Sequence, residues 1–232
     1  MDKQQSTNTM DNKTQHTTEN KPEKKPNESS GIYIRGHIKI FDPETQQVFI
    51  DKHNAIHYEN MSIALANSIA DKGQNFIYEM NFGNGGTSVD PTGIITYLPT
   101  NTVGQNANLY NPTYSKIVDD TAIANPDPVN NKMTVSHIPG TVYTDILVSC
   151  LLDYGEPSGQ SAFDNSTNLS GQYVFDELGL RGRSTDGTSG LTSTGLLLTH
   201  VVFHPVQKAL NRLIQIDYTV RIQTLTNLSS IG

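Results

Sequence analysis

The chain has 232 residues, one cysteine, no tryptophan and a formal net charge of −7 at pH 7. This length suits one large domain or two small ones. A protein that grips a nucleic-acid backbone needs a positive surface, so the acidic balance argues against nucleic-acid binding. The single cysteine, Cys150, excludes a fold held by intrachain disulfides. No apolar run approaches membrane-spanning length and no apolar signal segment opens the sequence, so we expect a soluble protein, made in a cytoplasm, with no membrane partner.

Residues 1–30 form a polar segment that contains no Leu, Ile, Val or aromatic residue. Five lysines balance five acidic residues there, so the whole net charge lies from Gly31 onward. Such a segment buries too little apolar surface to offset the entropy of ordering it. We therefore predict a disordered or extended N-terminal arm over residues 1–30 and a single β-rich domain over residues 31–232.

The first half of this domain is expected to begin with a hairpin and one helix. Residues 32–40 alternate between apolar and polar, with Gly36 at an expected bulge, and residues 47–50 return after a turn at 42–45. Residues 60–72 place Met61, Leu65 and Ile69 on one helical face, with Asn60 or Ser62 as the expected cap. The pattern also predicts strands over 76–82 and 93–98. A long irregular insertion follows near residues 99–131, either an extended loop or an arm that packs on another chain.

The second half of the domain is predicted to contain one hairpin of two strands and three further strands. Residues 132–138 and 142–152 flank the turn dipeptide Pro139-Gly140. After a polar stretch at 153–171, residues 173–180 form a strand, and a loop rich in Gly, Ser and Thr runs over 182–195. Residues 196–203 are almost continuously apolar, as in a central strand covered on both faces. Residues 214–223 alternate strictly, as in a sheet with one wet face.

Several strands separated by turn residues, one helix and no strand–helix–strand rhythm predict a mainly β fold. The expected architecture is an antiparallel β-sandwich or a barrel-like domain with one short helix.

The most conspicuous cluster of glycines, Gly83-Asn84-Gly85-Gly86, does not have the context of a phosphate-binding loop. Such a loop stands between a strand and a helix, usually with Lys followed by Ser or Thr, whereas Thr87-Ser88-Val89 follows here with no helical pattern. We interpret the cluster as a tight turn that ends a strand, with positive φ angles.

Two pairs of histidines, His53 with His57 and His200 with His204, have the i, i+4 spacing of metal ligands. On a strand, residues i and i+4 lie about 13 Å apart, too far to share one ion. The second pair falls in a strand pattern, and no third ligand is spaced to match the first. We therefore predict no metal site and no cofactor.

Two dipeptides, Asp119-Asp120 and Asp176-Glu177, offer adjacent carboxylates. Neighbouring residues of a strand point to opposite faces, so neither dipeptide forms an acid–base pair by itself. Cys150 lies on the apolar face of an expected strand, where a thiol packs as a small hydrophobic group. With no visible constellation of reactive groups, the protein is not expected to be an enzyme.

Tyrosines mark the candidate interface. Tyr97, Tyr110 and Tyr114 surround or lie in the long irregular segment, and Tyr154 precedes a Gly-Glu-Pro sequence. Tyrosine together with Asn and Ser on loops favours protein–protein contact or sugar binding, although tyrosines that merely cover the edge of a sheet are an equally ordinary explanation.

Two parts of the chain resemble known sequences. The stretches from His53-Asn54-Ala55-Ile56-His57 to Phe82-Gly83-Asn84-Gly85-Gly86-Thr87, and from Leu198-Thr199-His200 to Val220-Arg221-Ile222, are similar to uncharacterised virion structural proteins of large tailed bacteriophages of the marine myovirus type. The resemblance covers most of residues 31–224 and leaves out the polar arm. It implies a virion part built in many copies, and it carries no catalytic residues with it.

The sequence therefore favours a structural component of a tailed-phage virion, either a capsid decoration protein or a neck or tail protein. Its expected partners are other virion structural proteins and further copies of itself, and its expected location is the virion. The alternative is a carbohydrate-binding or receptor-binding β-sandwich module, although the lack of tryptophan weakens it. A hydrolase would need carboxylates that converge in a cleft.

Overall fold

The structure is a computed structural model that describes residues 30–72, 76–157, 172–183 and 195–226. Nearly all of these residues belong to one compact unit, Gly31–Leu225. A second unit, formed by Met1–Ser30 and Thr226–Gly232, lies outside the described residues except for Ser30 and Thr226. The expected arm over residues 1–30 therefore falls outside what the structure describes except for Ser30, as do residues 158–171 of the expected polar stretch at 153–171 and residues 184–194 of the expected loop at 182–195.

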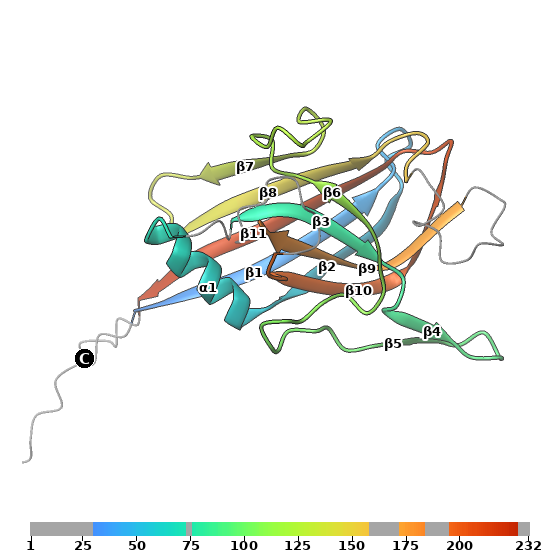
Figure 1. The fold of residues 1–232 in the computed structure, drawn as a ribbon, viewed down its shortest axis with the longest axis horizontal. Helices are drawn as coiled ribbons and strands as arrows, with labels where there is room; N and C mark the ends of the chain where they lie inside the picture. The colour runs from blue at the N-terminus through green and yellow to red at the C-terminus, as the bar shows by residue number, and fades with distance from the viewer. Residues whose placement is uncertain (1–29, 73–75, 158–171, 184–194, 227–232) are drawn as a thin grey trace, which may run out of the picture. The chain divides into compact units, whose positions relative to one another are not determined.

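The mainly β prediction is confirmed: nine strands of the described chain form one curled antiparallel sheet, and two short strands pair beside it (Figure 1). The order of the large sheet is β6-β3-β9-β10-β2-β1-β11-β8-β7. The elements are β1 (Ser30–Phe41), β2 (Val48–Ile56), α1 (Tyr58–Ile69), β3 (Ile77–Gly83), β4 (Thr87–Val89), β5 (Ile95–Tyr97), β6 (Pro112–Ile117), β7 (Lys132–His137), β8 (Tyr143–Leu152), β9 (Gln172–Gly182), β10 (Thr199–Ala209) and β11 (Ile214–Thr226).

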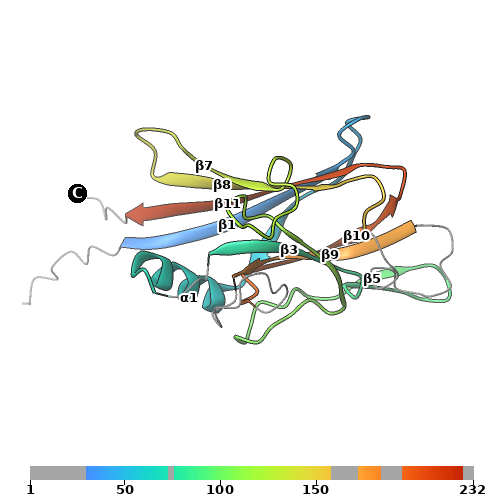
Figure 2. The ribbon, with the colours of Figure 1, turned by 45° about the horizontal axis from the view of Figure 1, so that its top comes forward.

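The curled sheet makes two facing layers, with β7, β8, β11 and β1 in one and β3, β9 and β10 in the other (Figure 2). The core lies between them and follows the period of two along each strand. Ile214, Ile216, Tyr218 and Val220 of β11 are at most 1% exposed, while the residues between them are only half-buried, which confirms the alternation read from the sequence. β10 sits in the middle of the sheet order, as its continuous apolar sequence predicts.

Two details of the first hairpin differ from expectation. Gly36 is not at a bulge, since the register of β1 and β2 shifts only between Ile40 and Phe41. A Cβ on Gly36 would lie 1.7 Å from Oδ1 of Asn54, so this glycine makes room for a side chain of the neighbouring strand. β2 also continues to Ile56, well beyond the strand expected from the sequence, because it pairs with β1 as far as Asn54 and then with β10 through Ala55 and Ile56.

The single expected helix is present, but it begins earlier and with a different cap. His57 caps α1, since its side chain accepts a hydrogen bond from the backbone N–H of Asn60, so the expectation of Asn60 or Ser62 was wrong. Met61 is buried against the sheet, whereas Ile69, on the same stripe, is 80% exposed. The apolar stripe therefore extends past the end of the core.

The irregular insertion expected at 99–131 contains one strand of the sheet. β6, Pro112–Ile117, pairs with β3 through Met80↔Lys116 and Phe82↔Tyr114. Its sequence does not alternate clearly, so only its pairing with β3 makes it recognisable as a strand.

Candidate functional site

The adjacent carboxylates of β9 tie two loops to the sheet. Glu177 is fully buried and accepts hydrogen bonds from the backbone N–H groups of Gly85, Tyr110 and Asn111, at 3.1, 2.9 and 2.8 Å. Burial raises the pKa of Glu177, but hydrogen bonds from His200 and from these amides outweigh it, so its pKa lies below the ordinary value. A carboxylate with this many donors is a structural anchor.

Asp176 holds the start of β4 in the same way. It accepts hydrogen bonds from the backbone N–H groups of Gly86 and Thr87, both at 2.9 Å, and from the Thr87 hydroxyl. Burial raises its pKa above the ordinary value despite these donors. Each carboxylate of this dipeptide is thus engaged separately with backbone amides of the neighbouring loops.

The glycines at 83–86 allow the backbone of this loop to approach the backbone near Asn111 closely. None of its glycines has a positive φ, so the interpretation as a positive-φ turn was wrong. A Cβ on Gly83 would lie 2.6 Å from the backbone oxygen of Asn111, and one on Gly85 would lie 2.8 Å from the backbone nitrogen of Asn111. The glycines let the two loops pack backbone against backbone around Glu177.

His200 completes the anchor and is held in one tautomer. Its Nδ1 atom accepts a hydrogen bond from the backbone N–H of Asn101 at 2.7 Å, so Nδ1 carries no proton. Its Nε2–H can therefore donate to Oε2 of Glu177, 3.0 Å away. Both side chains are fully buried. Both ring nitrogens of His200 are therefore engaged by groups of the protein.

The buried side chains of His57 and Asn60 hold the next part of the same loop, around Gly104 and Gln105. His57 accepts from Asn60 N–H at Nδ1 and donates from Nε2 to the backbone oxygen of Gly104 at 2.9 Å. The Asn60 amide donates to the backbone oxygens of Leu197 and Gln105, at 2.9 and 3.3 Å. The first part of the irregular insertion therefore packs on its own sheet, which answers the question that the sequence left open.

The remaining metal and acid candidates do not converge. His53 lies in β2 and His57 caps α1, while His200 is buried in β10 and His204 is exposed. Asp119 accepts from the backbone and hydroxyl of Thr121, whereas Asp120 contacts the backbone of Met133. No group of three His, Cys, Asp or Glu side chains is placed to hold a metal ion within the residues that the structure describes. Within the same ranges, no helix is long and apolar enough to cross a membrane.

Cys150 is fully buried on the inner face of β8, where the sequence placed it. Burial raises its pKa to about 12.

The four candidate interface tyrosines lie against different elements. Tyr97, Tyr110 and Tyr154 are each substantially exposed, and their hydroxyls lie within hydrogen-bond distance of His204, the Pro99 backbone oxygen and Glu44 respectively. Tyr114 is half-buried and packs on Phe82 and Tyr173 in the core. Three of the four therefore present ring surface to solvent, and their role in an interface stays a prediction.

Two buried lysines, Lys116 and Lys208, were not singled out in the sequence. Nζ of Lys116 donates to the backbone oxygen of Leu151 and to Glu156, at 2.7 and 2.6 Å. Nζ of Lys208 donates to the backbone oxygens of Asp153 and Ala209, both at 2.9 Å, and burial lowers its pKa to about 8. Lys208 lies two positions after buried Val206 on the same strand, so both side chains point to the same face. This alternation is the sequence signal that could have identified Lys208 as buried.

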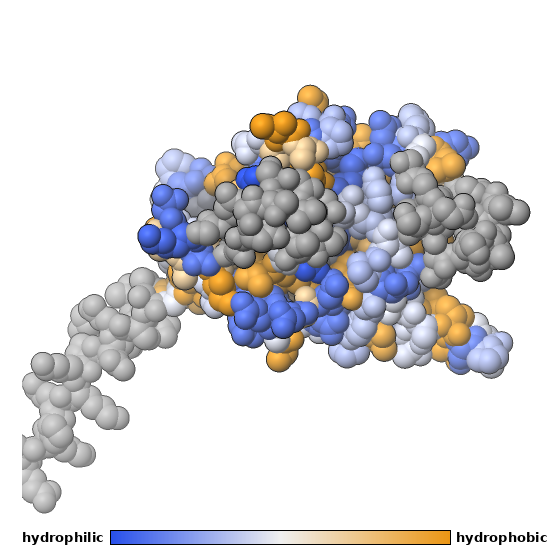
Figure 3. Space-filling view, viewed as in Figure 1, coloured by the Kyte–Doolittle hydropathy of each residue, from blue (hydrophilic) through white to orange (hydrophobic). Residues whose placement is uncertain are grey.

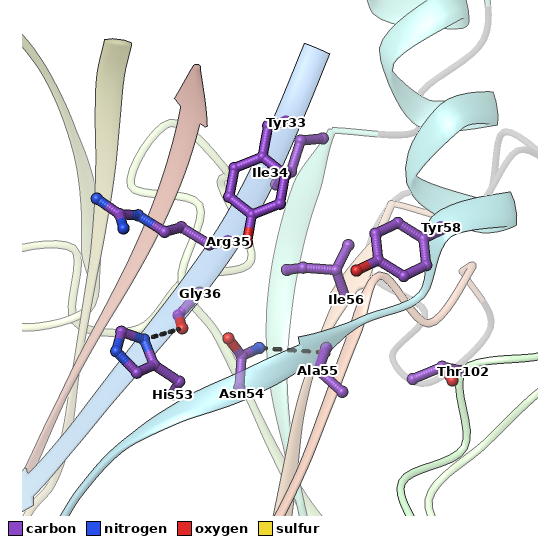
Figure 4. Close-up of a pocket in the computed structure, with 10 residues that line it drawn as sticks. All are labelled: Tyr33, Ile34, Arg35, Gly36, His53, Asn54, Ala55, Ile56, Tyr58 and Thr102. Carbon is purple, nitrogen blue, oxygen red and sulfur yellow. Dashed lines mark hydrogen bonds between the residues drawn. The ribbon is translucent and has the colours of Figure 1, made fainter. Parts of the chain in front are cut away.

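One concave site opens where β2 leaves β1, and we call it the fork pocket (Figure 4). The pairing of the two strands ends at Gly36↔Asn54, and a pocket of about 290 Å³ lies beyond it. Figure 4 shows the hydroxyls of Tyr33 and Tyr58 directed toward the fork, whereas Arg35 points away toward β11. The floor is aliphatic, from Ile34 and Ile56. Exposed tyrosine rings above an apolar floor suit a small amphipathic ligand such as a sugar.

An apolar groove of about 310 Å³ lies between α1 and the layer of β7, β8 and β11. Its walls include Met61, Leu65, Phe76, Met133, Ile146 and Ile222. Exposed apolar side chains lie at the same end of the sheet, on β1, α1, β7, β11 and the turn between β7 and β8: Ile32, Ile69, Val135, Ile138, Val142 and Leu225. We call the groove and these residues the apolar mouth, since both ribbon views show these elements ending together there, and apolar surface is visible beside α1 (Figures 1, 2 and 3).

The alternation of side chains along the strands explains part of the apolar mouth. Val142 shares the inward face of β8 with Ile146 and Val148, and Ile32 shares that of β1 with Ile34. The core pattern therefore runs on to the ends of these strands, beyond the point where α1 covers it. Exposed apolar patches of this kind on a soluble domain mark interaction surfaces.

Comparison of the chain with protein-family models, with curated proteins and with solved structures gave no match.

Proposed function

We propose that this protein is a structural subunit of a tailed-phage virion, a capsid decoration protein or a neck or tail component, that acts through protein–protein contacts. The observation that carries the proposal is the apolar mouth, a groove whose lining is almost wholly apolar and whose rim is exposed. Exposed apolar patches of this kind mark interaction surfaces, and a subunit of an assembly buries such a surface against its neighbours. The resemblance of residues 53–87 and 198–222 to phage virion proteins supports the same role.

The proposal includes no catalytic step and no cofactor. The groups best suited to proton transfer, Asp176, Glu177 and His200, are engaged by backbone amides and by one another. Their chemistry stabilises the loops around β9. The partners are other virion proteins and further copies of this chain, and the location is the virion.

The test is quantitative mass spectrometry and electron microscopy of particles of the encoding phage. The chain is expected as a stoichiometric component, at about sixty or more copies if it is a capsid protein and at about six or twelve if it belongs to the neck or tail. Its absence from purified particles would refute the proposal.

A matched pair of variants ties this role to the mouth. Val142→Asp places a charge on the rim, whereas Val89→Asp places the same charge on β4, at the opposite end of the sheet in Figure 1, where Val89 is 62% exposed. Phage carrying Val142→Asp should lose the chain from the particle, because a charge on an apolar contact is costly to bury. Phage carrying Val89→Asp should retain it.

The fork pocket favours a second candidate, a carbohydrate-binding or receptor-binding module. Clear and reproducible binding on a glycan array, lost on Tyr33→Ala and Tyr58→Ala, would support it. An unresponsive array would count against this second candidate.

A further inference from the structure

β7 is an edge strand of the large sheet, and nothing in the described chain pairs with its outer side along its length. It has no proline, and its side chains are exposed except for Met133. Open edges of this kind are templates for pairing with another strand, and soluble proteins normally blunt them. The strand also forms one wall of the apolar mouth, through Met133 and Val135.

Two contacts show which backbone groups of β7 face outward. Leu151 of β8 directs its N–H to Asn131 and its C=O to Lys116, on the β7 side, so the odd-numbered residues of β8 face β7. The ladder pairs these residues with even-numbered positions of β7, through Thr134↔Leu147 and Ser136↔Asp145. The backbone groups of Met133, Val135 and His137 therefore point away from the sheet.

One end of this open edge is already covered. The backbone N–H of Met133 lies 3.4 Å from Oδ1 of Asp120, which confirms that it points outward and places a carboxylate beside it. An incoming strand cannot pair there without displacing Asp120. The open positions are thus Val135 and His137, on either side of Ser136.

Part of the apolar mouth lies at the β7 edge itself. Val135, Ile138 and Val142 expose roughly 100 Å² each on or beside this strand, or about 300 Å², and the groove wall formed by Met133 and Val135 adjoins them, which suits an interface at the small end of the known range. The six rim residues are all apolar, so they do not repel the same residues of a second copy. The polar segment at residues 1–29 offers no Leu, Ile, Val or aromatic side chain to cover the rim.

We propose that the β7 edge and the adjoining side of the mouth are occupied by a second copy of this chain, paired β7 to β7 in antiparallel fashion about a two-fold axis at Ser136. Val135 then lies opposite the partner's His137, and each pair exchanges two backbone hydrogen bonds. The two sheets become one continuous sheet, and each β7 lies beside the β7 wall of the other copy's groove. This inference rests on the proposed function, since it names the first partner of the assembly surface.

The dimer is tested first on the full chain in solution, by native mass spectrometry and by light scattering over a concentration series. Val135→Asp should weaken the dimer at least about tenfold, since it puts a charge at the paired edge on a side chain that is 69% exposed in one copy. Val89→Asp, with similar exposure far from the mouth, should leave the dissociation constant within about twofold.

The register is tested by cysteine cross-linking. In the proposed pairing, Ser136 faces the partner's Ser136 as a non-hydrogen-bonded pair, with Cα atoms about 4.5 Å apart, which a disulfide can span. Oxidised Ser136→Cys should therefore form a covalent dimer. Thr134→Cys is the matched control, since it lies four register positions from its own copy, about 13 Å away, and should stay unlinked. The native thiol, Cys150, is buried and does not compete.

A chain that stays monomeric up to about 100 μM would overturn the proposal, as would a dimer that Val135→Asp leaves unchanged. Cross-linking of Thr134→Cys in place of Ser136→Cys would overturn the pairing about Ser136. A monomer that is nonetheless found in the particle at high copy number would separate the two ideas. The assembly role would then stand, and a different virion protein would occupy the mouth.

Discussion

Oε2 of Glu177 lies 3.0 Å from Nε2 of His200, and both side chains are fully buried. The carboxylate also receives the amides of Gly85, Tyr110 and Asn111, so one residue of β9 holds two loops that are far apart along the chain. Because these are hydrogen bonds to a charge in a buried setting, this anchor should dominate the stability of that side of the sheet.

Glu177→Gln should destabilise the fold by about 2–3 kcal/mol, because the amide is a weaker acceptor and brings N–H donors to a site already filled with donors. Urea unfolding followed by circular dichroism measures the change. Glu59→Gln in the first turn of α1, where the side chain is exposed, is the control and should shift the free energy of unfolding by less than about 0.5 kcal/mol. Equal effects of the two substitutions would contradict the anchoring role.

The same carboxylate predicts a pH dependence. The pKa of Glu177 is lower in the folded protein than its ordinary value of 4.5, so its contribution to stability is present above pH 4.5 and is lost as the pH falls through the folded pKa. Unfolding free energies of the parent protein should fall on acidification below pH 4.5 more steeply than those of Glu177→Gln. Parallel curves for the two proteins would show that this group does not titrate with folding.

Gly83→Ala should destabilise the protein by about 2 kcal/mol or more, because its Cβ would meet the Asn111 backbone oxygen at 2.6 Å and the Glu177 carboxylate at 2.5 Å. Gly31→Ala is the control, since nothing lies within 4 Å of a Cβ at that position. Thermal unfolding compares the two. If both alanines were tolerated equally, the close approach of the loops at Gly83 would not be rigid.

Cys150 should be inert in the folded state. It is fully buried and burial raises its pKa to about 12, so the thiolate that reacts with disulfide reagents is scarce and inaccessible. Ellman's reagent at pH 8 should label the protein only at the rate of unfolding, and labelling should become immediate in denaturant. Rapid labelling of the native protein would show that the β8 face opens to solvent.

Lys208 should make stability rise with pH on the alkaline side. Its folded pKa is about 8, against 10.5 when unperturbed, so the unfolded chain binds more protons between these values and folding gains as the pH increases. Lys208→Met should remove this slope, as measured by urea unfolding between pH 7.5 and 9.5. If the stability of the parent protein showed no such slope, the Lys208 amine would be in contact with water in the folded state.

Strand sequences with clear periodicity were predicted well, and sites made by distant residues were not. The alternation of β11, the Pro139-Gly140 hairpin and the apolar run of β10 each depend on near neighbours, and the structure confirms them. β6 was missed because only its pairing with β3 makes it a strand. The cap at His57 was missed because a histidine caps a helix only when its ring is held, here by Gly104 from the distant loop.

The same difference between local and distant contacts explains what the sequence did and did not predict about the candidate site. Asp176 and Glu177 stood out in the sequence as adjacent carboxylates, yet nothing local reveals that the loops at 83–87 and 109–111 bring their amides to them. The apolar mouth was also invisible, because Val142, Val135 and Ile32 look like ordinary inward positions until the short length of α1 leaves them uncovered.

By itself, the sequence determined the β class, the alternation of the strands, the single helix and the polar character of residues 1–30, since each depends on residue type and spacing within a few positions. The tertiary structure alone decided which carboxylates became anchors, which glycines were needed for close packing, and where the core was left open. These depend on which distant segments meet, and pairing across the sheet is a property of the whole chain that no short window of residues contains.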